Sequence, residues 1–230
     1  MSAFLSNSIF FGAGISLVCY EIGLLLKKRF KKAIFNPLLI GIICVMSVLA
    51  LTHVSYTEYY SGAKYISYFL TPATVCLAVP LYEQLTLLRK NLGAVAVGIV
   101  SGVAAGLASV FLFAKLFSLD HTMYVSLLAK SITTAIGMGV SEELGGIVTI
   151  TVAVIIVTGI LGNMLAEAVF RVFRIDEPIA RGLALGTASH AIGTSKAMEL
   201  GEVEGAMGSL AIAVAGLLTV VAAPIFAQIY

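Results

Sequence analysis

Residues 182–200, GLALGTASHAIGTSKAMEL, decide the fold that this sequence predicts. The stretch is apolar overall, yet glycines, hydroxyl side chains and one histidine, His190, interrupt it. Irregular backbone at membrane depth is tolerated only where it is buried in protein or lines a cavity. We therefore predict a broken helix over 180–200 that faces the functional interior of a membrane protein.

The composition of the whole chain agrees with a membrane setting. Hydrophobic residues make up 60% of its 230 residues and charged residues 11%, whereas a soluble domain is about a quarter charged. We predict one all-α polytopic membrane domain over 1–230, with about six to eight transmembrane segments at about 20 residues each, some of them broken or re-entrant. The net charge of +2 is too small for a nucleic-acid-binding protein.

The basic residues predict the orientation in the membrane. A block at 27–32 follows the first apolar run, and short basic loops stay in the cytoplasm. The loop at 27–32 is therefore predicted to be cytoplasmic, and the segment 55–64 external. Plain counting of later helices would leave Arg171, Arg174 and Arg181 outside, against the same rule. The conflict disappears if 130–146, KSITTAIGMGVSEELGG, is broken or re-entrant.

A weak internal repeat supports this interpretation. The stretch TPATVCLAVPLYEQL, within an apolar segment at 65–88, can be laid over TTAIGMGVSEELGG, which begins at Thr133. Transporters often contain such units in opposed orientation, and short segments interrupted by glycine or proline mark their binding sites. We predict an inverted repeat formed by 65–117 and 127–173.

Small polar and turn residues in the interrupted segments mark the predicted substrate site. They are Thr71, Pro72, Thr74, Ser131, Thr133, Thr134, Ser189, His190, Gly193 and Thr194. A broken helix offers unpaired N–H groups and a positive dipole, which suit a small carboxylate. The alternative for any single serine or threonine is a hydrogen bond to its own backbone.

His190 and Glu142 are the candidates for proton coupling. An ionisable group inside a membrane segment is costly, and imidazole titrates near physiological pH. The alternatives are a histidine that only packs between helices and a glutamate at the membrane interface. Lys196 is expected in a loop, and Glu204 in a solvated connection.

Other patterns predict packing rather than chemistry. Gly98, Gly102 and Gly106 share one helix face, which suits close helix packing. The three cysteines form no metal-ligand spacing. Because enzyme motifs are lacking as well, we expect a protein that is not an enzyme and has no catalytic residues, metal or cofactor.

The segment ARGLALGTASHAIGTSKAMELGE at 180–202 resembles the LrgB/CidB family of membrane proteins. The two interrupted segments already quoted resemble that family too, and the resemblance covers essentially the whole chain. It implies two functions. Bacterial members are described as holin- or antiholin-like modulators of murein hydrolase activity and autolysis, which act with a small LrgA/CidA-type membrane partner. Plastid relatives are glycolate/glycerate transporters, and bacterial members are linked to pyruvate and other overflow carboxylates.

The residues favour the second function. A holin has no use for broken segments with a buried histidine and threonine clusters, whereas a carrier needs them. We expect a secondary transporter of small monocarboxylates such as pyruvate, lactate or glycolate, with a proton as candidate coupling ion and a link to autolysis. The alternative is a holin- or antiholin-like pore or modulator of lysis. The protein is expected in the lipid bilayer of the bacterial plasma membrane, as a homodimer.

Overall fold

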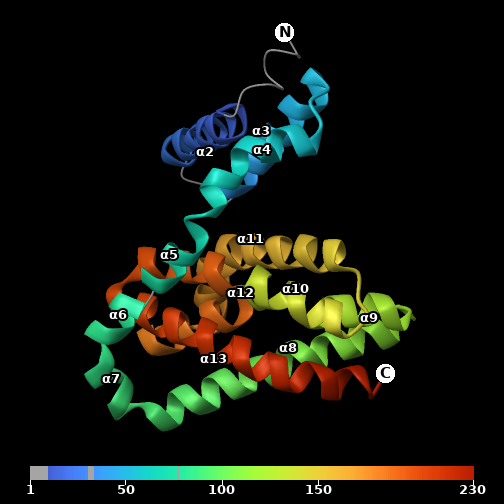
Figure 1. Ribbon diagram of the computed structural model, residues 1–230. Helices are drawn as coiled ribbons and strands as arrows, with labels where there is room; N and C mark the ends of the chain where they lie inside the picture. The colour runs from blue at the N-terminus through green and yellow to red at the C-terminus, as the bar shows by residue number, and fades with distance from the viewer. Residues whose placement is uncertain (1–9, 31–33, 77) are drawn as a thin grey trace. The chain divides into compact units, whose positions relative to one another are not determined.

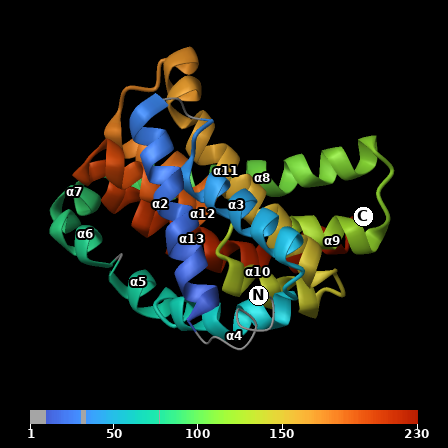
Figure 2. The same ribbon diagram turned by 90° about the horizontal axis from the view of Figure 1, so that it is seen from above.

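The computed structural model describes residues 10–30, 34–76 and 78–230, and the regular elements in these ranges are all helices. The all-helical prediction is thereby confirmed. The chain divides into two compact units, Met1–Cys76 and Leu77–Tyr230, and each is described by itself (Figures 1 and 2). A single membrane domain over 1–230 stays a prediction.

The N-terminal unit contains four described helices. They are α2 (Phe11–Phe30), α3 (Pro37–Thr52), α4 (Tyr56–Ser67) and α5 (Leu70–Cys76). Glycines let α2 approach its neighbours closely: a Cβ atom built on Gly23 would lie 2.6 Å from the carbonyl oxygen of Pro37. Gly12 likewise faces the backbone of Tyr59 in α4. Small residues at contacts of this kind are typical of helices packed in membranes.

Helix α4 occupies the segment 55–64 that the charge rule places outside. It begins with a capping box, in which the Ser55 backbone N–H donates to a Glu58 carboxylate oxygen at 2.8 Å. The Glu58 N–H donates in turn to the Ser55 hydroxyl at 3.3 Å. The reciprocal pair satisfies backbone groups at the helix start, and the Ser55 hydrogen bonds lower the pKa of the Glu58 carboxyl.

The C-terminal unit contains the longer helices. They are α6 (Ala78–Glu83), α7 (Leu85–Lys90), α8 (Leu92–Leu116), α9 (His121–Leu128), α10 (Thr134–Glu143), α11 (Val148–Phe173), α12 (Pro178–Leu200) and α13 (Glu202–Ala227). Figure 1 shows α12 between α11 and α8. Among the described helices, α8, α11 and α13 are long and apolar enough to cross a membrane. The protein is therefore a membrane protein, while six to eight crossings stay a prediction.

Two of the three apolar clusters in the described part of this unit hold α8, α12 and α13 together. One surrounds Tyr124 of α9, which is fully buried and donates its hydroxyl to the Phe226 carbonyl oxygen at 2.9 Å. The other joins Ile99 of α8, Leu183 of α12 and Met207 of α13. These clusters fix α8, α12 and α13 around the groove described below.

Buried hydroxyls shape the segment that the sequence predicts to be re-entrant. Thr151 Oγ1 lies 2.8 Å from the Ser126 carbonyl oxygen and 2.7 Å from Ser141 Oγ. The Ile147 N–H donates to Ser126 Oγ at 2.7 Å, and all three hydroxyl side chains are fully buried. The network joins α9, α10 and α11. It thereby fixes the turns by which the chain passes from the short helices α9 and α10 into the long helix α11. A re-entrant path through the membrane stays a prediction.

Candidate functional site

Helix α12 is broken in its middle. Ser189 (φ −133°, ψ 17°) and His190 (φ 42°, ψ −137°) leave the helical region, while the residues on both sides are helical. Positive φ is uncommon for a residue other than glycine. Gly193 fits the break because a Cβ atom there would lie 2.6 Å from Ser189 Cβ and even closer to the Leu185 carbonyl oxygen. Two half-helices, 178–188 and 191–200, result.

The His190 side chain points from this break toward α11. Its exposed fraction is 4%, and Nε2 lies 2.9 Å from the Ile155 carbonyl oxygen. Because a carbonyl oxygen can only accept, Nε2 carries the proton in this contact. The glycines of α11 make room for the break: a Cβ atom on Gly159 would lie 2.8 Å from His190 Nε2, and Gly162 faces Ser189.

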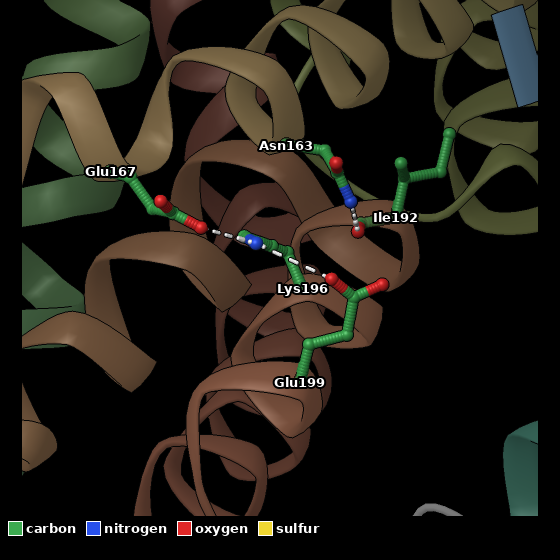
Figure 3. Close-up of polar contacts among 5 residues, drawn as sticks. All are labelled: Asn163, Glu167, Ile192, Lys196 and Glu199. Atoms are coloured by element: carbon green, nitrogen blue, oxygen red, sulfur yellow. Dashed lines mark hydrogen bonds and ion pairs between the residues drawn. The ribbon is translucent and has the colours of Figure 1, made fainter. Parts of the chain in front are cut away.

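The second half of α12 is fastened to α11 by polar contacts (Figure 3). Asn163 Nδ2 donates to the Ile192 carbonyl oxygen at 3.1 Å. Lys196 Nζ lies 2.6 Å from a Glu167 carboxylate oxygen and 3.3 Å from one of Glu199. The expectation of Lys196 in a loop was wrong, because α12 resumes after the break and continues to Leu200.

Helix α12 also packs very closely on α13. Cβ atoms on Gly182 and Gly186 would lie 2.4 and 2.5 Å from carbonyl oxygens of α13. Thr194 is fully buried against Gly208, and its hydroxyl has no hydrogen-bond partner in the described part of the chain. Glu204 is 7% exposed, so the expected solvated position was wrong: it lies in the first turn of α13, under α12.

A groove of about 840 Å³ lies between α8 and the first half of α12. Gly98, Gly102 and Gly106 line it from α8, and Lys130 and Ser131 line it from the connection between α9 and α10. Gly98 and Gly102 also pack on Leu183 and Thr187 of α12, whereas a Cβ atom on Gly106 would meet nothing within 4 Å. The glycine face therefore serves helix packing and also forms a wall of the groove.

The two ends of the groove differ in charge. Its charged lining residues, in the described ranges, are Lys130 and Glu177. The neighbours of Gly98 and Gly102 show that α8 and α12 run parallel here. Glu177 precedes α12, so it lies about 15 Å along the axis from Thr187, which lines the groove beside Lys130. We call the Lys130 end the inner end.

Lys130 provides the positive charge of the inner end. Its side chain is partly buried, and Nζ donates to Ser131 Oγ at 3.0 Å. None of the described carboxylates forms an ion pair with it. The hydroxyls of Ser101, Ser109 and Thr187 donate to carbonyl oxygens of their own helices. The remaining Lys130 N–H groups and the Ser131 O–H are therefore available as donors to an anion at this end.

The structure places the predicted substrate residues in different surroundings. Ser131 lines the groove. Thr133 and Thr134 begin α10, outside the groove lining. Ser189, His190, Gly193 and Thr194 lie at the break, against α11 and α13. Glu142 is exposed on α10. Their roles in binding and proton coupling stay predictions.

Thr71, Pro72 and Thr74 lie in α5 of the N-terminal unit. The side chains of Thr71 and Thr74 lie outside the described residues. Their pairing with 131–134 in one site, and the inverted repeat from which it follows, stay predictions.

Sequence reasoning missed Lys130 as a site residue. The rule that singles out His190, an ionisable group within an apolar membrane segment, applies equally to a lysine at the start of 130–146. The sequence around Thr187 does not identify it as a site residue, because the groove that it lines forms only when α8 and α12 pack together. No three histidine, cysteine or acidic side chains gather as a metal site in the ranges that the structure describes.

Comparison with known proteins agrees with the sequence resemblance. Residues 16–229 match the LrgB-like family. The proteins named antiholin-like protein LrgB from Bacillus cereus (strain B4264) and Bacillus anthracis (strain A0248) are each 40% identical over 218 residues, which cover 94% of this chain and 95% of the relative. No solved structure gives a significant match. The chain therefore belongs to the LrgB-like family of membrane proteins.

Proposed function

We propose that this protein is a secondary transporter of small monocarboxylates, of the pyruvate, lactate or glycolate type, in the bacterial plasma membrane. The observation that carries the proposal is Lys130, a partly buried ammonium without a described carboxylate partner at the inner end of the groove. An unpaired charge in a low-dielectric setting is costly, and a bound anion offsets that cost.

In this proposal the substrate carboxylate accepts hydrogen bonds from Lys130 and Ser131. Charge-assisted hydrogen bonds of this kind are roughly twice as strong as neutral ones. The short remainder of the substrate contacts glycine and alanine on α8 and α12. The groove is larger than such a substrate. We take the part between Glu177 and Lys130 as the path by which the substrate reaches the inner end.

Proton coupling at His190 belongs to the same proposal. The imidazole sits where α12 is broken and donates from Nε2 to α11, so a proton taken up at Nδ1 would place a positive charge at the contact between these helices. Thr71 to Thr74 would complete the site from the other repeat unit. A homodimer, a small LrgA/CidA-type partner and a cytoplasmic 27–32 loop complete the proposal.

Uptake by reconstituted protein tests it. Liposomes containing the protein should take up labelled pyruvate saturably and with a dependence on pH that His190→Ala weakens. Lys130→Met keeps the length of the side chain but removes its charge, and should lower uptake at least about tenfold. Lys90→Met, at an exposed lysine outside the groove lining, is the matched control. Unchanged uptake by Lys130→Met would contradict the proposed site.

A holin- or antiholin-like pore or modulator of lysis is the second candidate, favoured by the name antiholin-like protein LrgB that the relatives carry. A pore of that kind would release solutes without saturation and regardless of size. Release of a large trapped dye together with pyruvate, from the same liposomes, would support this candidate over the carrier. If the carrier is correct, an effect on autolysis follows from altered carboxylate flux.

A further inference from the structure

Thr219 of α13 carries a buried hydroxyl close to the inner end of the groove. Its exposed fraction is 5%. The described part of the chain gives it no hydrogen-bond partner, whereas Ser209, on the same helix and 6% exposed, donates to its own Gly205 carbonyl oxygen at 2.8 Å. Thr219 lines the cavity described next, so its hydroxyl can donate a hydrogen bond to an oxygen bound there.

Thr219 lines a small cavity at the inner end of the groove. The cavity has a volume of about 10 Å³, and Lys130, Ser131 and Thr187 line it together with Thr219. A volume of about this size admits one water molecule or one oxygen atom. Three residues with hydroxyl side chains, from α12, α13 and the connection between α9 and α10, thus line a space for a single oxygen together with Lys130.

We propose that this cavity is the seat of one carboxylate oxygen of the transported anion, and that Thr219 is a specificity-determining residue for it. The proposal rests on the proposed transport function. The seated oxygen accepts hydrogen bonds from Lys130 Nζ and from the hydroxyls of Ser131 and Thr219. The second carboxylate oxygen and the rest of the substrate remain in the wider groove.

Gly106 keeps the seat open. It lines both the cavity and the groove, and a Cβ atom built on it would meet nothing within 4 Å. A methyl group at this position therefore enters empty space rather than a neighbouring atom. Because alanine also favours a helix over glycine, Gly106→Ala should fold well while it narrows the space for the oxygen.

Pyruvate uptake by the full chain in liposomes tests the seat. Thr219→Val keeps the shape of the side chain without its hydroxyl, and should raise KM about tenfold with kcat within about twofold, because a lost hydrogen bond to a charged group weakens binding by about that factor. Thr219→Ser should stay within about twofold of the wild type. Gly106→Ala should raise KM as well, and Ser209→Ala on the same helix is the matched control.

The outcomes separate this inference from the transport function. If the wild-type protein shows no saturable uptake, both fail. If uptake is saturable and Lys130→Met lowers it, while Thr219→Val and Gly106→Ala keep the wild-type KM, the seat alone is overturned. Equal losses of kcat in Thr219→Val and Ser209→Ala, without a change in KM, would show that the hydroxyl only packs, and would also overturn it.

Discussion

His190 combines an unfavourable backbone conformation with a buried, hydrogen-bonded side chain. At φ 42° and ψ −137° the residue occupies a region that favours glycine, and such strain costs about 1–3 kcal/mol. The hydrogen bond between Nε2 and the Ile155 carbonyl oxygen offsets part of this cost. The side chain thus compensates for a backbone turn that a glycine would make more easily.

Two substitutions at this position separate the side chain from the backbone. Both His190→Ala and His190→Gly lose the hydrogen bond, but only glycine relieves the strain. We expect His190→Gly to be more stable than His190→Ala by about 1 kcal/mol, measured as the free energy of unfolding in detergent. The reverse order would contradict the described backbone at the break.

At the residue scale, the sequence predicts part of the site. His190 stands among glycines and hydroxyls, so its importance is readable from its neighbours. Lys130 borders a polar segment and is easily taken for an interfacial residue. Only the packing of the helices shows that Lys130 lines a groove, and that none of the described carboxylates forms an ion pair with it.

At the scale of elements, the buried hydroxyl network determines how α9, α10 and α11 connect. Thr151 joins Ser126 and Ser141 where the chain turns back. Thr151→Val should destabilise the protein by about 1–3 kcal/mol, because buried polar groups lose their partner. Thr149→Val, at an exposed position of the same helix, is the control, and thermal unfolding in detergent is the measurement. Equal effects of the two variants would argue against the network.

The ion pair between Lys196 and Glu167 fixes the second half of α12 to α11. Its Lys196 side chain is 13% exposed, but that of Glu167 is 58% exposed, so solvent screens the interaction. A double-mutant cycle with Lys196→Met and Glu167→Gln should give a coupling free energy of about 0.5–1 kcal/mol. A coupling near zero would mean that the ion pair adds nothing to the Asn163 hydrogen bond and the apolar packing of Ala197 on Phe170.

Long elements are predicted from the sequence far better than short ones. The apolar runs that correspond to α8, α11 and α13 are long enough to identify directly. The apolar stretch 65–88 instead divides among several helices, including α5 and α6. Pro72 and Pro80 each lie in the first turn of one of these, where proline is tolerated because its missing N–H needs no partner there. Composition alone does not place these boundaries.

For the whole molecule, the charge rule makes a prediction about orientation. With the native cysteines replaced, a cysteine at Glu58 should react with a membrane-impermeant maleimide in intact cells. A cysteine at Asp176, whose side chain is 88% exposed, should react only after permeabilisation, because 171–181 is predicted to be cytoplasmic. Labelling of both positions in intact cells would contradict the inverted repeat.

The break gives the two halves of α12 different attachments. The second half is held by α11 through Asn163 and Lys196, whereas the first half lines the groove and lies against the α13 backbone at Gly182 and Gly186. A change of angle at His190 would therefore carry the first half and the start of α13 together. The width of the groove is thus coupled to the position of α13.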